Sequence, residues 1–117
     1  SSEIVAGALQ DLDRAVIVGN WFDSEGSIVA PWSAAQGSFT GLANSTYWYS
    51  GADGYYYYKD PVAPGAATPT ALFTTYTAPT TSPVSGAHLE IKIVVQAVIA
   101  DKSVANAAWG VGTGNLR

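Results

Sequence analysis

Apolar and polar residues alternate most regularly between residues 89 and 99. Every second position of this stretch is apolar, and these positions are Leu89, Ile91, Ile93, Val95, Ala97 and Ile99. Because successive side chains of a strand point to opposite faces, a period of two predicts a long β-strand. We expect the apolar face to lie in the core. Val94 and Val98 interrupt the polar face, so we expect that face to be partly covered towards the end of the strand.

Shorter apolar runs between turn residues predict five further strands. These runs cover residues 14–22, 27–32, 46–49, 55–59 and 71–77. Asp53-Gly54 is a turn signal directly before four consecutive tyrosines at residues 55–58. In a strand, Tyr55 and Tyr57 should face one way and the other two tyrosines the opposite way. Several short strands with frequent turns predict an all-β fold, a jelly-roll or Greek-key sandwich.

The remaining segments predict loops and one short helix. Residues 78–87 contain two prolines and a glycine among Ser and Thr, which is typical of an exposed loop. Ser103 is a candidate N-cap for a helix that runs to Trp109 and is ended by Gly110. The glycine-rich residues 110–115 predict a flexible tail or an arm.

The first dozen residues are apolar although they form a chain end, where disorder is the rule. Their spacing also fits a helical stripe, but Gly7 and the later apolar run at residues 16–18 favour an extended strand. An open sheet edge presents unpaired N–H and C=O groups and can accept such a strand from another molecule. We therefore expect residues 1–12 to be a strand donated to a neighbouring copy and residues 13–117 to form the β-sandwich domain. The side chains entering the neighbour would be Ile4, Val5, Leu9 and Leu12.

The composition argues against several classes of partner. The chain has 117 residues, which suits one domain, and only 12% of them are charged. Its net charge of −4 argues against nucleic acid, which is bound through Lys and Arg, and against an anionic membrane surface. The absence of Cys excludes disulfides and thiolate metal sites. No apolar run is long enough to span a bilayer. The sequence contains no Met, not even at residue 1, so we expect a processed chain from which any targeting segment has been removed.

Candidate catalytic residues are few. His88 is the only histidine, which excludes a His-Glu-x-x-His zinc site, and we expect it to be a surface residue at the start of its strand. The acidic pairs Asp11/Asp13 and Asp23/Glu25 continue into no calcium-loop pattern, and we interpret them as solvated turn acids. We therefore predict no catalytic, cofactor-binding or metal-binding residue, and no enzyme.

Aromatic residues gather in the middle of the chain and recur near its end. The set comprises Trp48, Tyr55, Tyr56, Tyr57, Tyr58 and Trp109. Stacked rings can bind sugars or single-stranded bases. Tyrosine also has an apolar body and a polar tip, so packing in the core or against neighbouring subunits explains the set equally simply. We prefer the packing interpretation.

Asn44 heads the sequon Asn44-Ser45-Thr46 and is therefore a candidate for an N-linked glycan. The pattern often arises by chance. It is compatible with an exported protein.

Two stretches of the chain resemble a known family. The first runs from Trp48 through Asp53-Gly54-Tyr55-Tyr56-Tyr57-Tyr58-Lys59, Val62-Ala63-Pro64-Gly65 and Thr70-Ala71-Leu72-Phe73. The second is the strand from Leu89 to Ala97 followed by Ala107-Ala108-Trp109-Gly110. In this order they resemble the TasA/camelysin family of exported proteins, which a dedicated signal peptidase, SipW, matures. Residues 1–46 show no comparable similarity, and no metal motif supports the peptidase activity attached to the name camelysin.

The resemblance implies a jelly-roll subunit of extracellular biofilm-matrix fibres, in which the N-terminal strand of one subunit completes the sheet of the next. Archaeal bundling pili are similar. The expected partners are copies of the chain itself in a helical filament, and the low charge favours lateral bundling of such filaments. We expect no cofactor, no nucleic acid and no membrane. The alternatives are a secreted carbohydrate-binding β-sandwich module, a virion capsid or decoration protein and, third, a protease.

Overall fold

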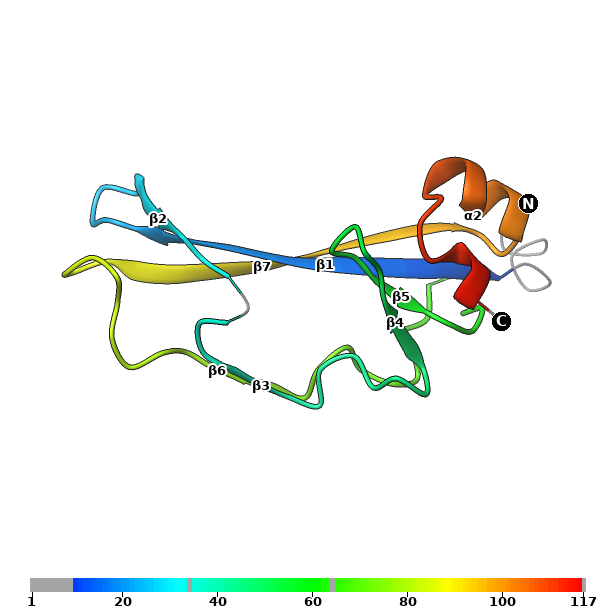
Figure 1. Ribbon diagram of the computed structural model, residues 1–117, viewed down its shortest axis with the longest axis horizontal. Coiled ribbons are helices and arrows are strands. Elements are labelled where there is room, and N and C mark those ends of the chain that lie inside the picture. Colours follow the sequence, from blue (N-terminus) through cyan, green and yellow to red (C-terminus); the bar gives the residue numbers. More distant parts are fainter. Residues whose placement is uncertain (1–9, 34, 64, 117) are drawn as a thin grey trace. The chain divides into compact units, whose positions relative to one another are not determined.

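The computed structural model describes residues 10–33, 35–63 and 65–116, and in this part the chain is mostly β-structure (Figure 1). The fold class is therefore all-β, as the sequence predicts. The chain forms two units, of which unit 1 contains Ser1–Val16, Ala43–Leu72 and Val95–Arg117, and unit 2 contains Ile17–Leu42 and Phe73–Val94. The elements are β1 (Asp11–Phe22), β2 (Ile28–Pro31), β3 (Ser38–Thr40), β4 (Trp48–Ser50), β5 (Tyr56–Tyr58), β6 (Thr75–Thr77), β7 (His88–Ile99), α2 (Lys102–Ala108) and η1 (Thr113–Asn115).

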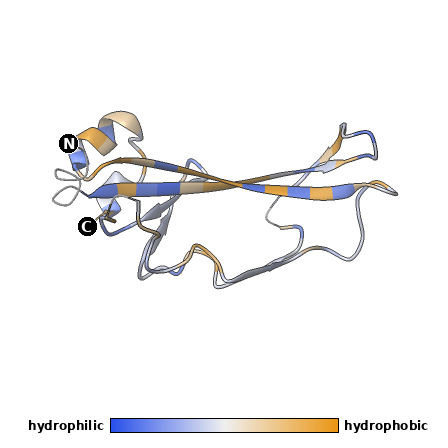
Figure 2. Cartoon of the chain, turned by 180° about the vertical axis from the view of Figure 1, so that it is seen from behind, coloured by the Kyte–Doolittle hydropathy of each residue, from blue (hydrophilic) through white to orange (hydrophobic). Residues whose placement is uncertain are grey.

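Strand β1 makes most of the strand pairings. It pairs antiparallel with β2 and with β5, where Arg14 lies opposite Tyr57, and it also pairs with β7. Strand β5 pairs in turn with β4, which completes a sheet of five strands. Strands β3 and β6 form a separate two-stranded sheet with Phe39 opposite Tyr76. Figure 2 shows hydrophobic and hydrophilic residues alternating along the two long strands.

Most strands lie where the sequence predicts them. Strands β1, β2, β4 and β5 overlap the predicted runs, although β1 begins three residues earlier, at Asp11 instead of Arg14. Strand β6 occupies only the last three residues of the run 71–77. Strand β3 matches no predicted run, because the three residues of Ser38–Thr40 are too few to display a period. Residues 78–87 contain no helix or strand, as expected of a loop.

Strand β7 is confirmed, and its second face is partly covered towards the end as expected, but the assignment of the first face to the core is wrong over the second half of the strand. The covered positions are Leu89 and Ile91 at the start of the strand, and Val94, Gln96 and Val98 further along. The positions expected in the core but exposed within the chain are Ile93, Val95, Ala97 and Ile99. The cause is a pair of contacts on the other face. The side chain of Gln96 binds Arg14 of β1, and Val98 packs against the cluster that contains Tyr57, so the residues between them point away.

The tyrosines of residues 55–58 alternate between two clusters of unit 1, as their sequence predicts. Tyr57 is completely buried and Tyr58 is nearly so. The first cluster comprises Leu12, Tyr57, Ala105 and Leu116, with Tyr55 and Trp109 among the side chains packed against it. The second comprises Trp48, Tyr58 and Val62, with Tyr56 packed against it. All six aromatic residues of the predicted set therefore take part in packing.

Leu12 belongs to the core of its own chain. The sequence assigns it to the segment donated to a neighbour, but its side chain is only 2% exposed and lies in the cluster of Tyr57. Strand β1 already begins at Asp11, which exchanges two backbone hydrogen bonds with Val62, of 2.7 and 2.8 Å. A donated segment must therefore end before Asp11. The remaining residues assigned to it, Ile4, Val5 and Leu9, lie outside the described residues.

Aromatic contacts hold unit 2 together. The ring of Trp32 meets the rings of Phe39 and Tyr76 edge-on, at centroid distances of 6.2 and 6.1 Å. Its indole N–H also donates a hydrogen bond of 3.1 Å to the hydroxyl of Tyr76. Phe73 packs edge-on against Phe39 at 5.1 Å. These contacts attach the sheet of β3 and β6 to the segment that follows β2.

The C-terminal region differs from its prediction in two details. The N-cap of α2 is Asp101, not Ser103, because the Asp101 carboxylate accepts hydrogen bonds from the backbone N–H and the hydroxyl of Ser103, at 2.8 and 2.6 Å. The glycine-rich segment is not a flexible arm either. It forms η1 after a left-handed turn at Gly112, and the next residue, Leu116, is only 3% exposed. The segment instead closes the core cluster of unit 1.

Candidate functional site

Strand β7 carries apolar side chains that the chain itself leaves uncovered. In unit 1 these are Val95, Ala97 and Ile99, which we call the outer row. Val95 is 64% exposed and Ile99 is 43% exposed. Exposed single apolar residues are common in proteins, but several on one face of one strand indicate a contact surface. The outer row is therefore the first candidate for function.

The edge of the same strand is open. In the part of the chain that the structure describes, β7 pairs with β1 and with no other strand. Its second edge therefore presents N–H and C=O groups without a strand partner. Soluble proteins usually protect such edges with charged residues, proline or a bulge, yet residues 95–99 contain no charge and no proline. This edge is suited to receive another strand.

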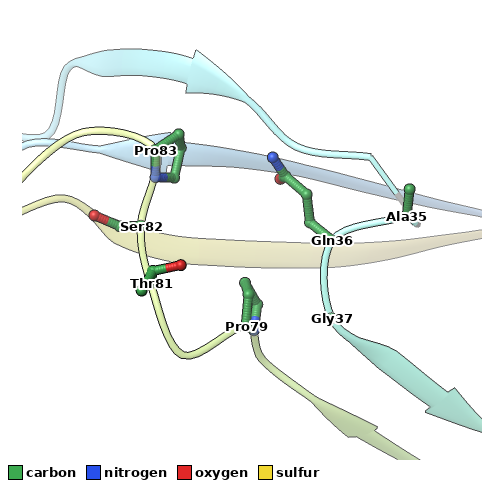
Figure 3. A pocket seen from close by; sticks show the side chains of 7 residues that line it. All are labelled: Ala35, Gln36, Gly37, Pro79, Thr81, Ser82 and Pro83. Atoms are coloured by element: carbon green, nitrogen blue, oxygen red, sulfur yellow. The ribbon is translucent and has the colours of Figure 1, made fainter.

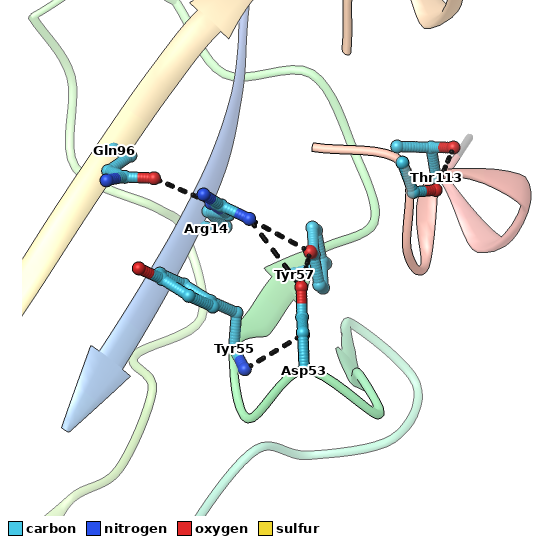
Figure 4. Close-up of polar contacts among 7 residues, drawn as sticks. Arg14, Asp53, Tyr55, Tyr57, Gln96 and Thr113 are labelled. Atoms are coloured by element: carbon cyan, nitrogen blue, oxygen red, sulfur yellow. Dashed lines mark hydrogen bonds and ion pairs between the residues drawn. The ribbon is translucent and has the colours of Figure 1, made fainter. Parts of the chain in front are cut away.

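A polar cluster around Arg14 supports the outer row from the opposite face of β7 (Figure 4). The guanidinium of Arg14 donates a hydrogen bond of 2.7 Å to the side-chain oxygen of Gln96 and one of 3.2 Å to the hydroxyl of Tyr57. It also lies 3.6 Å from the carboxylate of Asp53. Its carbon Cζ is 3.8 Å from the ring centre of Tyr55, a cation–π geometry. Because Gln96 is held inward, its neighbours Val95 and Ala97 must face outward.

The electrostatics of this cluster stabilise its charged form. The hydroxyl of Tyr57 donates a hydrogen bond to the Asp53 carboxylate. Burial pushes the pKa of Asp53 upward, but hydrogen bonds from Tyr57 and from the backbone of Tyr55, together with Arg14, outweigh it and hold that pKa below its ordinary value. Burial and the bond to Asp53 raise the pKa of Tyr57. The polar groups of the cluster are bonded to one another, so we call it the internal clamp.

Sequence reasoning did not single out Arg14 or Gln96. The available signal was Arg14 itself, a charged residue inside the predicted strand 14–22. An arginine in a strand needs a carboxylate or aromatic partner when it is covered. The Asp53-Gly54 turn supplies the carboxylate and the tyrosine run supplies the aromatic rings. The pairing of β1 with β5 brings these groups to Arg14.

Both tryptophans of the aromatic set make contacts within unit 1. Trp48 is only 4% exposed, donates its indole N–H to the carbonyl of Thr70 at 3.1 Å and packs edge-on against Tyr58. Trp109 lies against the ring of Tyr57 and the guanidinium of Arg14, at 5.8 and 4.8 Å. Since a sugar needs an open ring face, these contacts argue against carbohydrate binding through either tryptophan.

Asn44 lies in an exposed turn before β4. Its side-chain oxygen accepts a hydrogen bond of 3.0 Å from the backbone N–H of Thr46, so the sequon is folded as an Asx turn. Its backbone carbonyl accepts from the N–H groups of Tyr47 and Trp48. The position is accessible, and its glycosylation stays a prediction.

The titratable residues singled out by the sequence do not converge. His88 is exposed at the start of β7, as predicted, with its ring on Phe22 and 2.8 Å from the Glu90 carboxylate. Asp23 is a turn acid that accepts from the backbone of Glu25, as expected. Asp11 and Asp13 lie inside β1, so their interpretation as turn acids is wrong. Residues 10–33, 35–63 and 65–116 contain no group of three or more His, Cys, Asp or Glu placed to hold a metal.

Two hollows of unit 2 differ in the residues that line them. The larger, of about 350 Å³, is lined mainly by prolines, small hydroxyl residues and Gln36 (Figure 3). The smaller, of about 200 Å³, lies along β1 and β7 beside Gly19. No charged side chain lines the larger hollow, whereas Glu90 and Lys92 line the smaller one. Among the described residues, no helix is both long and apolar enough to cross a membrane.

Comparisons with known proteins do not extend this description. No protein family, no curated protein and no solved structure matches the chain. The functional conclusion therefore rests on the outer row, the open edge of β7 and the sequence of residues 1–10.

Proposed function

We propose that this chain is the repeating subunit of an extracellular filament that polymerises head to tail. An N-terminal segment of one copy completes the sheet of the next, and the completed fold is a jelly-roll sandwich. The observation that carries the proposal is the outer row, because Val95 alone leaves 64% of its surface in water. Several apolar side chains exposed on one face of a strand mark an interaction surface, and in the proposed subunit the next copy covers it.

The chain itself supplies a suitable partner. The segment before Gln10 contains Ile4, Val5 and Leu9 and a single charged side chain, Glu3. Strand addition by an apolar segment gains main-chain hydrogen bonds and side-chain burial together. A contact of this kind joins two different surfaces of identical subunits, so it does not close, and repetition produces a helical filament. The resemblance to the TasA/camelysin family supports the same conclusion and an extracellular location.

Electron microscopy and sedimentation of the purified protein test this function. Wild-type protein should form filaments, and the double variant Ile4→Asp/Leu9→Asp should remain a folded monomer. The matched control is Ser1→Asp/Ser2→Asp, which adds the same charge to the same segment at polar positions and should still polymerise. Normal filaments from the first variant would contradict strand donation. Wild-type protein that stays monomeric or forms closed shells would contradict the filament, and shells would favour the capsid alternative.

A further inference from the structure

We infer that the acceptor is the edge of β7 turned away from β1, and that residues 1–9 of a second copy add there antiparallel to β7. This inference rests on the filament proposed above. The edge has room for such a strand, since β7 has twelve residues and in the described chain pairs along one side only. Nine extended residues span roughly 30 Å, a length that a twelve-residue strand accommodates.

The acceptor edge and the donor match in hydrophobicity on both faces. In unit 1, β7 turns Val98 towards the core and the outer row towards solvent, so both faces of residues 95–99 carry apolar side chains. The donor also carries apolar residues at both parities, with Ile4 and Ala6 on one face and Val5 and Leu9 on the other. Donor side chains on the same face would lie beside the outer row and cover part of its exposed surface.

The start of the chain's own sheet indicates that the receiving edge belongs to another copy. The backbone carbonyl of Gln10 accepts a hydrogen bond of 2.7 Å from the N–H of Ala100, the residue immediately after β7. A straight continuation of β1 upstream of Gln10 therefore has no residue of its own β7 left to pair with. To reach the edge of β7 that is turned away from β1, residues 1–9 would have to reverse the direction of the chain. Their sequence contains one glycine and no proline, Asn-Gly or Asp-Gly turn signal.

The direction of β1 also fixes the orientation of the added strand. Strands β1 and β7 point in opposite directions (Figure 4). In a head-to-tail filament the donor continues the direction of β1 into the next copy, where it runs antiparallel to β7. The rival occupant of the edge is β7 of a second copy. That pairing is symmetric, closes into a dimer and leaves the apolar N-terminal segment unused.

Aspartate substitution tests the acceptor edge. Val95→Asp should reduce sedimenting polymer at least tenfold while leaving the monomer folded, because Val95 is 64% exposed within the chain. Ile28→Asp is the matched control, since Ile28 lies on β2 and is 61% exposed. It should polymerise normally. Circular dichroism checks folding, and Val95→Thr, a milder change of the same position, should weaken polymerisation without unfolding the chain. Full polymerisation of Val95→Asp would overturn the inference.

Engineered disulfides locate the donor directly, because the natural chain has no Cys. Ile4→Cys combined in turn with Val95→Cys, Ala97→Cys or Ile99→Cys should give a covalent ladder on oxidation in at least one case. Ile4→Cys with Ile28→Cys should give none. Filaments without any ladder would overturn the acceptor edge and leave the filament intact, whereas absence of wild-type filaments would contradict the filament itself. A covalent dimer from Val95→Cys alone would show pairing of β7 with β7 and overturn the inference.

Discussion

Arg14 of β1 and Gln96 of β7 face each other, with Nε of the guanidinium donating to the amide oxygen at 2.7 Å. Over the second half of β7 the even-numbered side chains are the covered ones, whereas the sequence pattern assigns the odd-numbered ones to the core. The face that carries Gln96 is therefore covered, and the opposite face stays open for a partner. The hydrogen bond joins residues separated by 82 positions, so no local pattern reveals it.

Replacing Arg14 should destabilise unit 1. Arg14→Met keeps the length of the side chain but removes its bonds to Gln96, Tyr57 and Asp53. Hydrogen bonds to charged groups contribute about 1.5–3 kcal/mol, so we expect the free energy of unfolding to fall by about 2–3 kcal/mol. Urea denaturation followed by tryptophan fluorescence measures it. The control is Lys92→Met at an exposed position, which should change stability by less than about 0.5 kcal/mol. Equal losses in the two variants would contradict the clamp.

The stabilising contribution of Asp53 should disappear in acid. Its pKa is lowered in the folded chain because the hydrogen bonds from Tyr57 and Tyr55 and the charge of Arg14 outweigh the effect of burial. A lowered pKa means that the contribution is complete above the unfolded carboxyl pKa and is lost as the pH falls through the folded pKa. Asp53→Asn should therefore be less stable than wild type at pH 7, and the difference should shrink below about pH 4. Thermal denaturation across this range tests it, with the exposed Glu25→Gln as control.

Asp13 should affect the pH dependence of stability in the opposite direction to Asp53. Burial, and secondarily the charge of Asp11, raise its pKa in the folded chain. The folded state then binds the proton more tightly than the unfolded state, so stability is lost as the pH rises from the unfolded carboxyl pKa through the folded one. Asp13→Asn should be more stable than wild type at pH 7, and its advantage should vanish in acid. If Asp13→Asn and Asp53→Asn showed the same trend with pH, one of the two assignments would be wrong.

The turn at Gly112 admits no side chain. Its φ is +82°, and an added Cβ would lie 2.9 Å from the ring of Tyr49 and 3.0 Å from that of Tyr57. Left-handed backbone and overpacking act together there, so Gly112→Ala should cost about 2–4 kcal/mol. Gly114→Ala is the control, because nothing lies within 4 Å of its added Cβ. It should change the midpoint of urea unfolding very little, and a comparable loss at Gly114 would argue against the packing of the tail.

The elements of this fold can be predicted from local pattern, but their faces and ends cannot. The alternation of Tyr55 to Tyr58 is settled by strand geometry, since neighbouring side chains must diverge, and the two clusters confirm it. The end of α2 could be predicted from Gly110, which adopts φ +71° there. The cap was misassigned by two residues because Asp101 and Ser103 are both good N-caps, and the sequence does not show which one accepts the bond.

The candidate site could be predicted only in part for the same reason. An apolar strand at residues 89–99 is evident, but its open face depends on Gln96 meeting Arg14, a contact made by tertiary pairing. Leu12 is equally ambiguous, since an apolar residue near a chain end has the same pattern in a donated strand and in a core strand. The burial of Leu12 and the pairing of Asp11 with Val62 distinguish the two.

This distinction gives the last prediction, which separates folding from assembly along one stretch of chain. Leu12→Ala removes a side chain that is 2% exposed in the core of its own chain, so it should lower the stability of the monomer by about 2–5 kcal/mol. Ile4→Ala, a truncation of comparable size in the proposed donor, should leave monomer unfolding unchanged and raise the protein concentration at which filaments appear. Urea denaturation below the polymerisation threshold measures the first effect, and sedimentation across a concentration series measures the second. If Ile4→Ala destabilised the monomer as much as Leu12→Ala, residues 1–9 would be packing within their own chain, and the edge of β7 would have no donor.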